Sequence, residues 1–218
     1  MPHVKFLLPP SLLGALLLLV SFIEGSPQPA PASPLGMYSP AWNETKYLAC
    51  NTAANTRYMS ADEKEVIYIL NMVRMDPSLF ANTVVKQYPA KTGQEQLVNT
   101  SYYKTLLETL GALKPLKLIT PDSLCFASAY CHALSTGKAG TVTHNRSTDE
   151  CINKLYFNGE CCDYGHNKAL DILMALLIDQ GVPSLGHREI CLSAYKTMAV
   201  SIQPHMVYRY TAVLDFEY

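Results

Sequence analysis

The C-terminal part of the chain changes from helical to alternating hydrophobic spacing, and this change limits the folds that the chain can adopt. Residues 167–179 carry apolar side chains at helical spacing, whereas residues 198–202 and 208–217 alternate apolar with polar or small side chains. Between the two alternating runs, residues 203–206 read as a turn, so the sequence predicts an antiparallel hairpin with one buried face. Helices followed by closing strands, without β-α-β alternation, predict an α+β domain.

Helices are predicted in the preceding part of the chain. Ser60 and Glu63 form a capping box, which predicts a helix over about 61–74 that ends before Pro77. A short second helix is expected to begin at Pro77, and another is expected over about 102–110. The buried stripe of the first helix is Val66, Ile69, Leu70 and Val73.

A longer helix is predicted after residue 120. Thr120 supplies an N-cap and Pro121 a proline in the first turn, and the helix is expected to run to Gly137. Its apolar residues at helical spacing predict the face that packs inward: Leu124, Ala127, Cys131 and Leu134.

The N-terminus is typical of a secretory signal peptide. Residues 6–23 are an almost uncharged apolar run, so we expect residues 1–25 to be removed and the protein to be secreted and extracellular. A membrane anchor is the alternative, but Pro9-Pro10 shortens the run below the roughly 20 residues of a span. No stable membrane span is therefore expected after cleavage.

The remaining chain divides into an extension and one domain. Residues 26–58 are expected to form a Pro-rich linker and N-terminal extension, with folded structure from residue 41 or later. Residues 59–218 are enough for a single domain with its own core. The formal net charge of −1 with 16% charged residues gives no basic stripe, which argues against a nucleic-acid partner.

Seven cysteines lie beyond the predicted signal peptide, where disulfide bonds are favoured. Seven is odd, so at least one thiol is free or pairs outside the chain. Cys125 and Cys131 are too far apart along one helix to bridge each other. Cys151 with Cys161 or Cys162 is the more natural local bridge, although spacing leaves the connectivity open.

Two histidine motifs are candidates for a metal site. They are Thr143-His144-Asn145-Arg146 and Gly186-His187-Arg188-Glu189, with Gly159-Glu160-Cys161 between them. Two neutral imidazoles with nearby acids suit a divalent cation, with zinc the best match. Each histidine also has a structural interpretation, in which His144 bonds to a loop backbone and His187 pairs with Glu189.

The order of these motifs resembles the CAP superfamily, which comprises cysteine-rich secretory proteins, antigen 5 and pathogenesis-related proteins (the SCP domain). The resemblance rests on Leu70-Asn71-Met72-Val73-Arg74, His144-Asn145-Arg146, Gly159-Glu160 and Gly186-His187-Arg188, and covers about 60–217. It is greatest to divergent or bacterial-type members. It implies an α-β-α sandwich with a three-stranded antiparallel sheet between helices, and a cavity lined by two histidines and two acids.

The resemblance assigns this cavity to His144, Glu160, Asp171 and His187, with the two histidines as metal ligands. Cys161 replaces the usual asparagine after the glutamate, and Asp171 stands where the family has glutamate. On its helix, Asp171 lies at the flank of the apolar stripe, from which it can reach a cavity. The alternative is an acid that only favours the helix dipole.

The resemblance implies a secreted, non-enzymatic binding module whose ligand is a cation, a lipid, a sterol or an extracellular protein. A metal-dependent hydrolase, such as a protease, that uses the same cavity is the alternative, and a vestigial cavity is a third possibility. A thiol enzyme using Cys161 or Cys162 is conceivable, but disulfide bonding is more typical of such cysteines. Three further histidines match no motif and are expected to be surface or structural residues: His132, His166 and His205.

Three sequons are candidate N-glycosylation sites, at Asn43, Asn99 and Asn145. A glycan on Asn145 would stand beside His144, so full occupancy there would argue against an open pocket.

Overall fold

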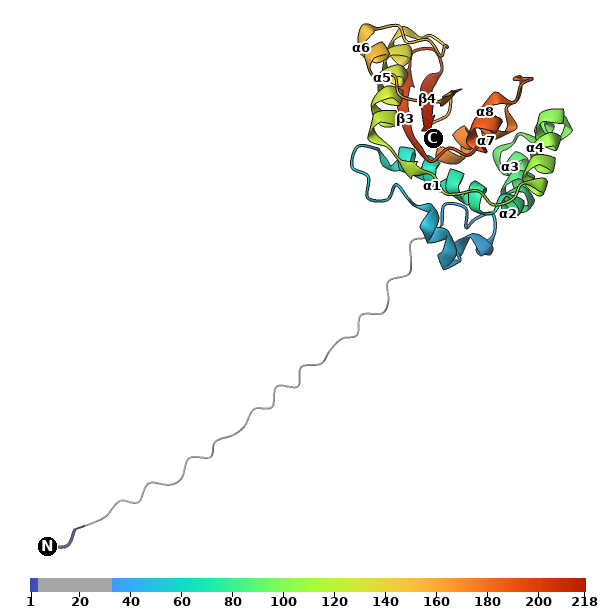
Figure 1. The fold of residues 1–218 in the computed structure, drawn as a ribbon. Helices are drawn as coiled ribbons and strands as arrows, with labels where there is room; N and C mark the ends of the chain where they lie inside the picture. Colours follow the sequence, from blue (N-terminus) through green and yellow to red (C-terminus); the bar gives the residue numbers. More distant parts are fainter. Residues whose placement is uncertain (4–32) are drawn as a thin grey trace. The chain divides into compact units, whose positions relative to one another are not determined.

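The structure is a computed structural model that describes residues 1–3 and 33–218 (Figure 1). The predicted signal sequence from residue 4 onward and the first part of the Pro-rich segment therefore lie outside the described residues. Within the described ranges, no helix is long and apolar enough to cross a membrane.

A four-stranded sheet forms the centre of the folded part, in the order β1-β3-β4-β2. Strands β3 (Thr197–His205) and β4 (Arg209–Glu217) form an antiparallel hairpin, and β2 (Gly159–Tyr164) pairs antiparallel with β4. Strand β1 (Thr120–Pro121) adds a short parallel pairing to β3. The α+β class is confirmed, but the sheet has four strands where three were expected.

The hairpin turn lies later than predicted. Pairing of β3 with β4 continues through Pro204 opposite Tyr210 and His205 opposite Arg209, so the turn comprises residues 206–208. The prediction of a turn at 203–206 was wrong because Pro204, a turn former in isolation, is accommodated in the strand.

Helices α1 (Ala61–Met75) and α7 (Ala169–Ile178) pack against one face of the sheet and form the apolar core with it (Figure 1). The capping box is present, since Ser60 Oγ accepts from the amide of Glu63 and Glu63 Oε2 accepts from the amide of Ser60. The predicted stripe of α1 is buried. From the sheet, this core receives Cys161, Met198, Val200, Ala212, Leu214 and Phe216.

Helix α5 (Ser123–Ala139) packs against β3 and β4 on the opposite face. Its small residues Ala129 and Ala133 contact Cys162 and Val213, so Cys162 faces away from the apolar core that holds Cys161. Because strand side chains alternate, Glu160 and Asp215 share this face with Cys162 and Val213. The buried polar residues between α5 and the sheet are here called the polar layer: Ser128, His132, Thr136, Glu160, Thr211 and Asp215.

Both the first residue of helix α5 and its buried face differ from the prediction. Asp122, and not Thr120, is the N-cap, and its Oδ1 accepts hydrogen bonds from the amides of Leu124 and Cys125. Leu124, expected inside, is 55% exposed. The helix approaches β3 closely at Gly137, where an added Cβ would lie 2.2 Å from the carbonyl oxygen of Pro204. Only glycine therefore permits this contact.

The N-terminal extension is part of the folded unit from residue 33. Leu35 is fully buried, so the expectation that folded structure starts at residue 41 or later was wrong. Trp42 is also buried, and its indole Nε1 donates to Thr83 Oγ1 (3.0 Å). The Tyr47 ring packs against Trp42 at a tilt of 53°, and its hydroxyl donates to Asp76 Oδ2 (2.9 Å).

The helices expected at Pro77 and near residues 102–110 are present, and they belong to a set of shorter elements that complete the fold. These elements are η1 (Pro40–Asn43), η2 (Thr45–Cys50), α2 (Pro77–Phe80), the π-helical η3 (Ala81–Val85), α3 (Lys86–Thr92), η4 (Glu95–Asn99), α4 (Ser101–Ala112), α6 (Asp149–Asn153) and α8 (Gly186–Cys191).

One disulfide joins Cys131 of α5 to Cys151 of α6. The expectation that Cys125 and Cys131 do not bridge is confirmed, whereas the suggested pairing of Cys151 with Cys161 or Cys162 was wrong. On β2, Cys161 faces the apolar core and Cys162 faces Ala129 and Ala133 of α5, and both remain thiols. The other five cysteines are buried free thiols: Cys50, Cys125, Cys161, Cys162 and Cys191.

Candidate functional site

The two predicted histidines lie near each other. His144 comes from the loop between α5 and α6, and His187 from the first turn of α8. Their ring centroids are 6.3 Å apart and the ring planes are inclined by 30°. The fold thus brings together two residues that are far apart in the sequence.

Glu160 holds the ring of His144 from the adjacent strand β2. His144 Nδ1 and Glu160 Oε1 are 2.7 Å apart. Arg146 Nη2 lies 2.5 Å from Glu160 Oε2 and 3.4 Å from Asp215 Oδ2, and it also donates to Ser128 Oγ. The Arg146 side chain is only 2% exposed and stacks over Phe157. A buried guanidinium therefore bridges two carboxylates of the polar layer.

These contacts separate the protonation states of the two acids. Burial alone would raise the pKa of Glu160, but hydrogen bonds from His144 and Arg146 outweigh it and lower the pKa to about 2. For Asp215, burial and then the negative charge of Glu160 raise the pKa to about 9. The hydrogen bond to Glu160 raises the pKa of His144. These opposite pKa shifts favour an ionised Glu160 and a protonated Asp215 at neutral pH.

Asp179 holds the ring of His187 and was not identified from the sequence. Its Oδ1 lies 2.7 Å from His187 Nδ1, and its Oδ2 accepts from the backbone amide of His187 (3.0 Å). Asp179 follows α7 in the left-handed conformation (φ 58°) and is buried. An aspartate tolerates this conformation better than most residues, so its place at the helix end was the one local signal available.

Asp171 lies elsewhere and does not contact either histidine ring. Its Oδ1 accepts from the hydroxyl of Tyr88 (2.8 Å), and both line a separate hollow of about 300 Å³ that His166 also borders. The structural interpretation of His187 also changes, because the ring pairs with Asp179 and not with Glu189.

The arrangement of the two histidines suits metal binding. Each ring uses Nδ1 for a carboxylate, and within the described residues neither Nε2 atom has a hydrogen-bond partner. A carboxylate that fixes one ring nitrogen and orients the other is the usual support of a metal-binding histidine. Two imidazoles on one tetrahedral zinc have centroids roughly 5 Å apart, so the rings would need to approach by about 1 Å.

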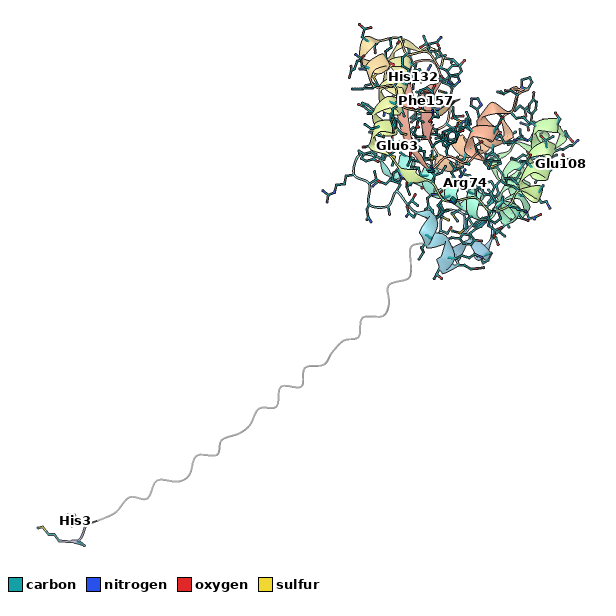
Figure 2. The ribbon with its side chains drawn as sticks, in the orientation of Figure 1. His3, Glu63, Arg74, Glu108, His132 and Phe157 are labelled. Carbon is teal, nitrogen blue, oxygen red and sulfur yellow. A yellow bond between two sulfur atoms is a disulfide. The ribbon has the colours of Figure 1, made fainter. Side chains whose placement is uncertain are left out.

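A second group of ligand atoms lies deeper, in the polar layer. One ligand atom each of His132, Glu160 and Cys162 lies within 4.8 Å of the others, and these three buried residues can hold a metal ion. His132 was expected to be a surface or structural residue, yet it is fully buried on α5 (Figure 2). The sequence carried no motif for it.

The cysteines beside this site are thiols. Burial raises the pKa of both Cys161 and Cys162 well above the ordinary value. Cys162 Sγ lies 3.8 Å from His144 Nδ1, whereas Cys161 Sγ faces the carbonyl of His187. A nucleophilic thiolate is disfavoured at both positions in the metal-free protein.

Other predicted features have a clear place in the structure. The three sequon asparagines Asn43, Asn99 and Asn145 are exposed. The polar residues of the Leu70–Arg74 motif have a structural role. Asn71 hydrogen-bonds both backbone groups of Ile119, and Arg74 donates to the carbonyls of Cys191 and Ser193. His205 donates to or accepts from backbone groups, as expected of a structural residue.

A hollow of about 530 Å³ lies away from the histidines, between α5 and α6. Its lining includes Tyr130, Leu134, Ala139 and the Cys131–Cys151 disulfide, with Lys138 among its polar residues.

Comparison with protein-family profiles, curated proteins and solved structures found no match to this chain.

Proposed function

We propose that this chain is a secreted, non-enzymatic binding module of the CAP/SCP type. It binds a divalent cation, zinc by preference, through Nε2 of His144 and Nε2 of His187. Its further ligand is an extracellular lipid, sterol or protein. The proposal combines the motif order along the chain with the geometry around the two rings.

The observation that carries the cation proposal is the pair of carboxylate-held imidazoles. Glu160 and Asp179 each approach an Nδ1 atom at 2.7 Å, on rings whose centroids are 6.3 Å apart. The metal position between His144 Nε2 and His187 Nε2 is here called the outer site. Both acids orient the histidines and do not act as ligands there. Water or a partner's side chain then fills the remaining coordination positions.

Binding is favoured over hydrolysis, the alternative, by the state of the acids. A metal-dependent hydrolase needs a general base beside an open coordination position. Glu160 is held by His144 and Arg146, and Asp179 by His187 and the backbone amides of α8. Neither carboxylate near the histidines is therefore free to accept a proton from water.

Zinc calorimetry on the purified protein tests the outer site. We expect His187→Ala to remove one binding equivalent, and His166→Ala to leave it unchanged. His166 is the matched control because its Nδ1 is also held by a carboxylate, Asp163. An equal stoichiometry in His187→Ala and in the unchanged protein would contradict the proposal. Zinc-dependent cleavage of a peptide library that is lost in His187→Ala would favour the hydrolase instead.

A lipid is the ligand class favoured by the hollow between α5 and α6. We expect a fluorescent fatty-acid analogue to bind the protein, and Leu134→Asp, within the lining, to abolish binding. Leu124→Asp is the control, since Leu124 lies on the same helix and is 55% exposed. Equal binding by both variants would place the lipid elsewhere.

A further inference from the structure

We propose a second, inner metal site in the polar layer, in which His132, Glu160 and Cys162 bind one zinc-like cation through imidazole, carboxylate and thiolate. The site does not need His187, but it shares Glu160 with the outer site, where Glu160 orients the ring of His144.

The hydrogen bonding of His132 leaves one nitrogen as an unused ligand. Its Nε2 lies 2.8 Å from the carbonyl oxygen of Thr143. A carbonyl only accepts, so Nε2 carries the proton and Nδ1 of the neutral ring is a bare lone pair. This Nδ1 atom is buried and has no hydrogen-bond partner within the described part of the chain. A ring held by a backbone carbonyl and left with a free nitrogen is arranged as in metal-binding histidines.

The strand geometry directs the other two ligands toward that nitrogen. Glu160 and Cys162 are separated by one residue on β2, so their side chains point to the same face, toward α5. Together with His132, they place three ligand atoms within 4.8 Å of one another. His144 Nδ1, which is 3.8 Å from Cys162 Sγ, becomes a fourth ligand when it releases its proton and its contact with Glu160 Oε1.

This donor set selects the class of cation. Nitrogen, sulfur and carboxylate ligands suit zinc, whereas calcium and magnesium require oxygen ligands. Ligand atoms on one tetrahedral zinc lie roughly 3.3–3.7 Å apart, given bond lengths of about 2.0–2.3 Å. Separations of up to 4.8 Å must therefore close by about 1 Å when the metal binds.

The surrounding charges can balance such a cation. When zinc binds, the Cys162 thiol releases its proton to solvent, and thiolate and carboxylate together neutralise the two positive charges of the metal. Arg146 then keeps its contact with Glu160 Oε2, while Oε1 exchanges its contact with His144 Nδ1 for one with the metal. Loss of the Asp215 proton when the metal binds then supplies the counter-charge for this guanidinium, whose Nη2 lies 3.4 Å from Asp215 Oδ2.

A route to the site exists past His144. The side chain of His144 is 58% exposed and lies over Glu160, in a loop without regular secondary structure. We expect rotation of this ring to give a metal ion access to Glu160 Oε1 and Cys162.

Cobalt titration distinguishes the two sites, because only the inner one contains sulfur. The purified protein is titrated with Co²⁺ without reductant, so that the Cys131–Cys151 disulfide stays intact. We expect a sulfur-to-cobalt charge-transfer band in the near ultraviolet that saturates at one equivalent. Cys162→Ala and His132→Gln should abolish the band, and zinc binding at this site should weaken by more than the roughly 10- to 100-fold that loss of a ligand-orienting residue costs.

Cys161→Ala is the matched control. Cys161 is adjacent in the chain but faces the apolar core, so the band should persist in this variant and in His187→Ala. Thermal unfolding of each variant in EDTA establishes that it is folded. A band that is absent from the unchanged protein, or that persists in Cys162→Ala, overturns the inner site. An equal zinc stoichiometry in His187→Ala and in the unchanged protein, with the band intact, overturns only the outer site.

Discussion

The two faces of the sheet are formed by the same strands but are buried against different chemistry. Toward α1 and α7, the sheet contributes apolar side chains such as Leu214 and Phe216. Toward α5, the neighbouring positions on the same strands are Asp215 and Glu160, which form a cross-strand pair. Both faces are buried, so the difference lies in what is buried and not in how much.

This difference shows where the fold gains stability and where it retains chemical capacity. Burial of apolar area stabilises the folded state, whereas a buried polar group contributes little even when it is paired. Within the described residues, five buried side-chain atoms lack a hydrogen-bond partner: His132 Nδ1, Arg146 Nε, Glu160 Oε2, Thr211 Oγ1 and Asp215 Oδ1. Four of them belong to the polar layer and the fifth to Arg146, which bridges two of its acids; both candidate metal sites also receive Glu160 from this layer.

Truncation on the apolar face should have the largest effect on stability. Phe216 is fully buried and packs beside Tyr195. We expect Phe216→Ala to lower the free energy of unfolding by about 3–5 kcal/mol, because it leaves a cavity. Urea denaturation measures this loss, and zinc stoichiometry should not change. A loss below about 1 kcal/mol would show that the apolar face is not the main source of stability.

Removal of the buried guanidinium tests the polar layer. Arg146→Gln leaves ionised Glu160 with His144 alone, and we expect a loss of about 3 kcal/mol at pH 7. The pKa of Glu160 is lowered on folding, so its stabilising contribution is present above the unfolded value of 4.5 and is lost as the pH falls toward about 2. Denaturation in EDTA at pH 7 and pH 2.5 should show the deficit shrinking with acidity. A constant deficit would mean that Arg146 acts through packing on Phe157.

The adjacent cysteines give a direct comparison of the faces. Cys161→Ser places a hydroxyl in the apolar core, which should cost about 1–3 kcal/mol when the hydroxyl is unpaired. Cys162→Ser should cost less than about 1 kcal/mol, because polar groups such as His144 and Glu160 surround it. Equal losses in urea denaturation would contradict the assignment of the two side chains to different faces.

Features encoded by neighbouring residues were predictable from the sequence. The capping box of Ser60 and Glu63 and the hairpin at the C-terminus depend on local preference and spacing, and both are present. Long-range contacts were not predictable. Thr120 and Pro121 pair with β3 instead of starting a helix, and Cys151 reaches back to Cys131. In both cases the partner, β3 or Cys131, lies far away in the sequence, and no local pattern identifies it.

The face of α5 shows why the inner site could not be predicted. Hydrophobic spacing selects Leu124, Ala127, Cys131 and Leu134 as the buried stripe, since an amphipathic helix normally turns its apolar side inward. Of these four, the structure buries only Cys131, and it also buries Ser128, His132 and Thr136 of α5, which lie against a polar sheet face. The rule fails where both partners in an interface are polar. His144, His187 and Glu160 were located by motif order, whereas Asp179 required the structure.

Asp215 gives the smallest and most specific test of the polar layer. Its pKa is raised on folding from 3.8 to about 9, first by burial and then by Glu160, so its contribution is most favourable below the unfolded value and is lost as the pH rises toward the folded value. Asp215→Asn keeps the shape of the protonated acid but cannot ionise, so the variant does not lose stability as the pH rises. We therefore expect it to stabilise the metal-free protein by on the order of 1 kcal/mol at pH 7, and by more at pH 8.5. Thermal unfolding in EDTA from pH 5 to pH 8.5 measures this slope. If Asp215→Asn destabilises the protein at every pH, the carboxylate is ionised against Arg146, and the polar layer holds two charged acids in place of one.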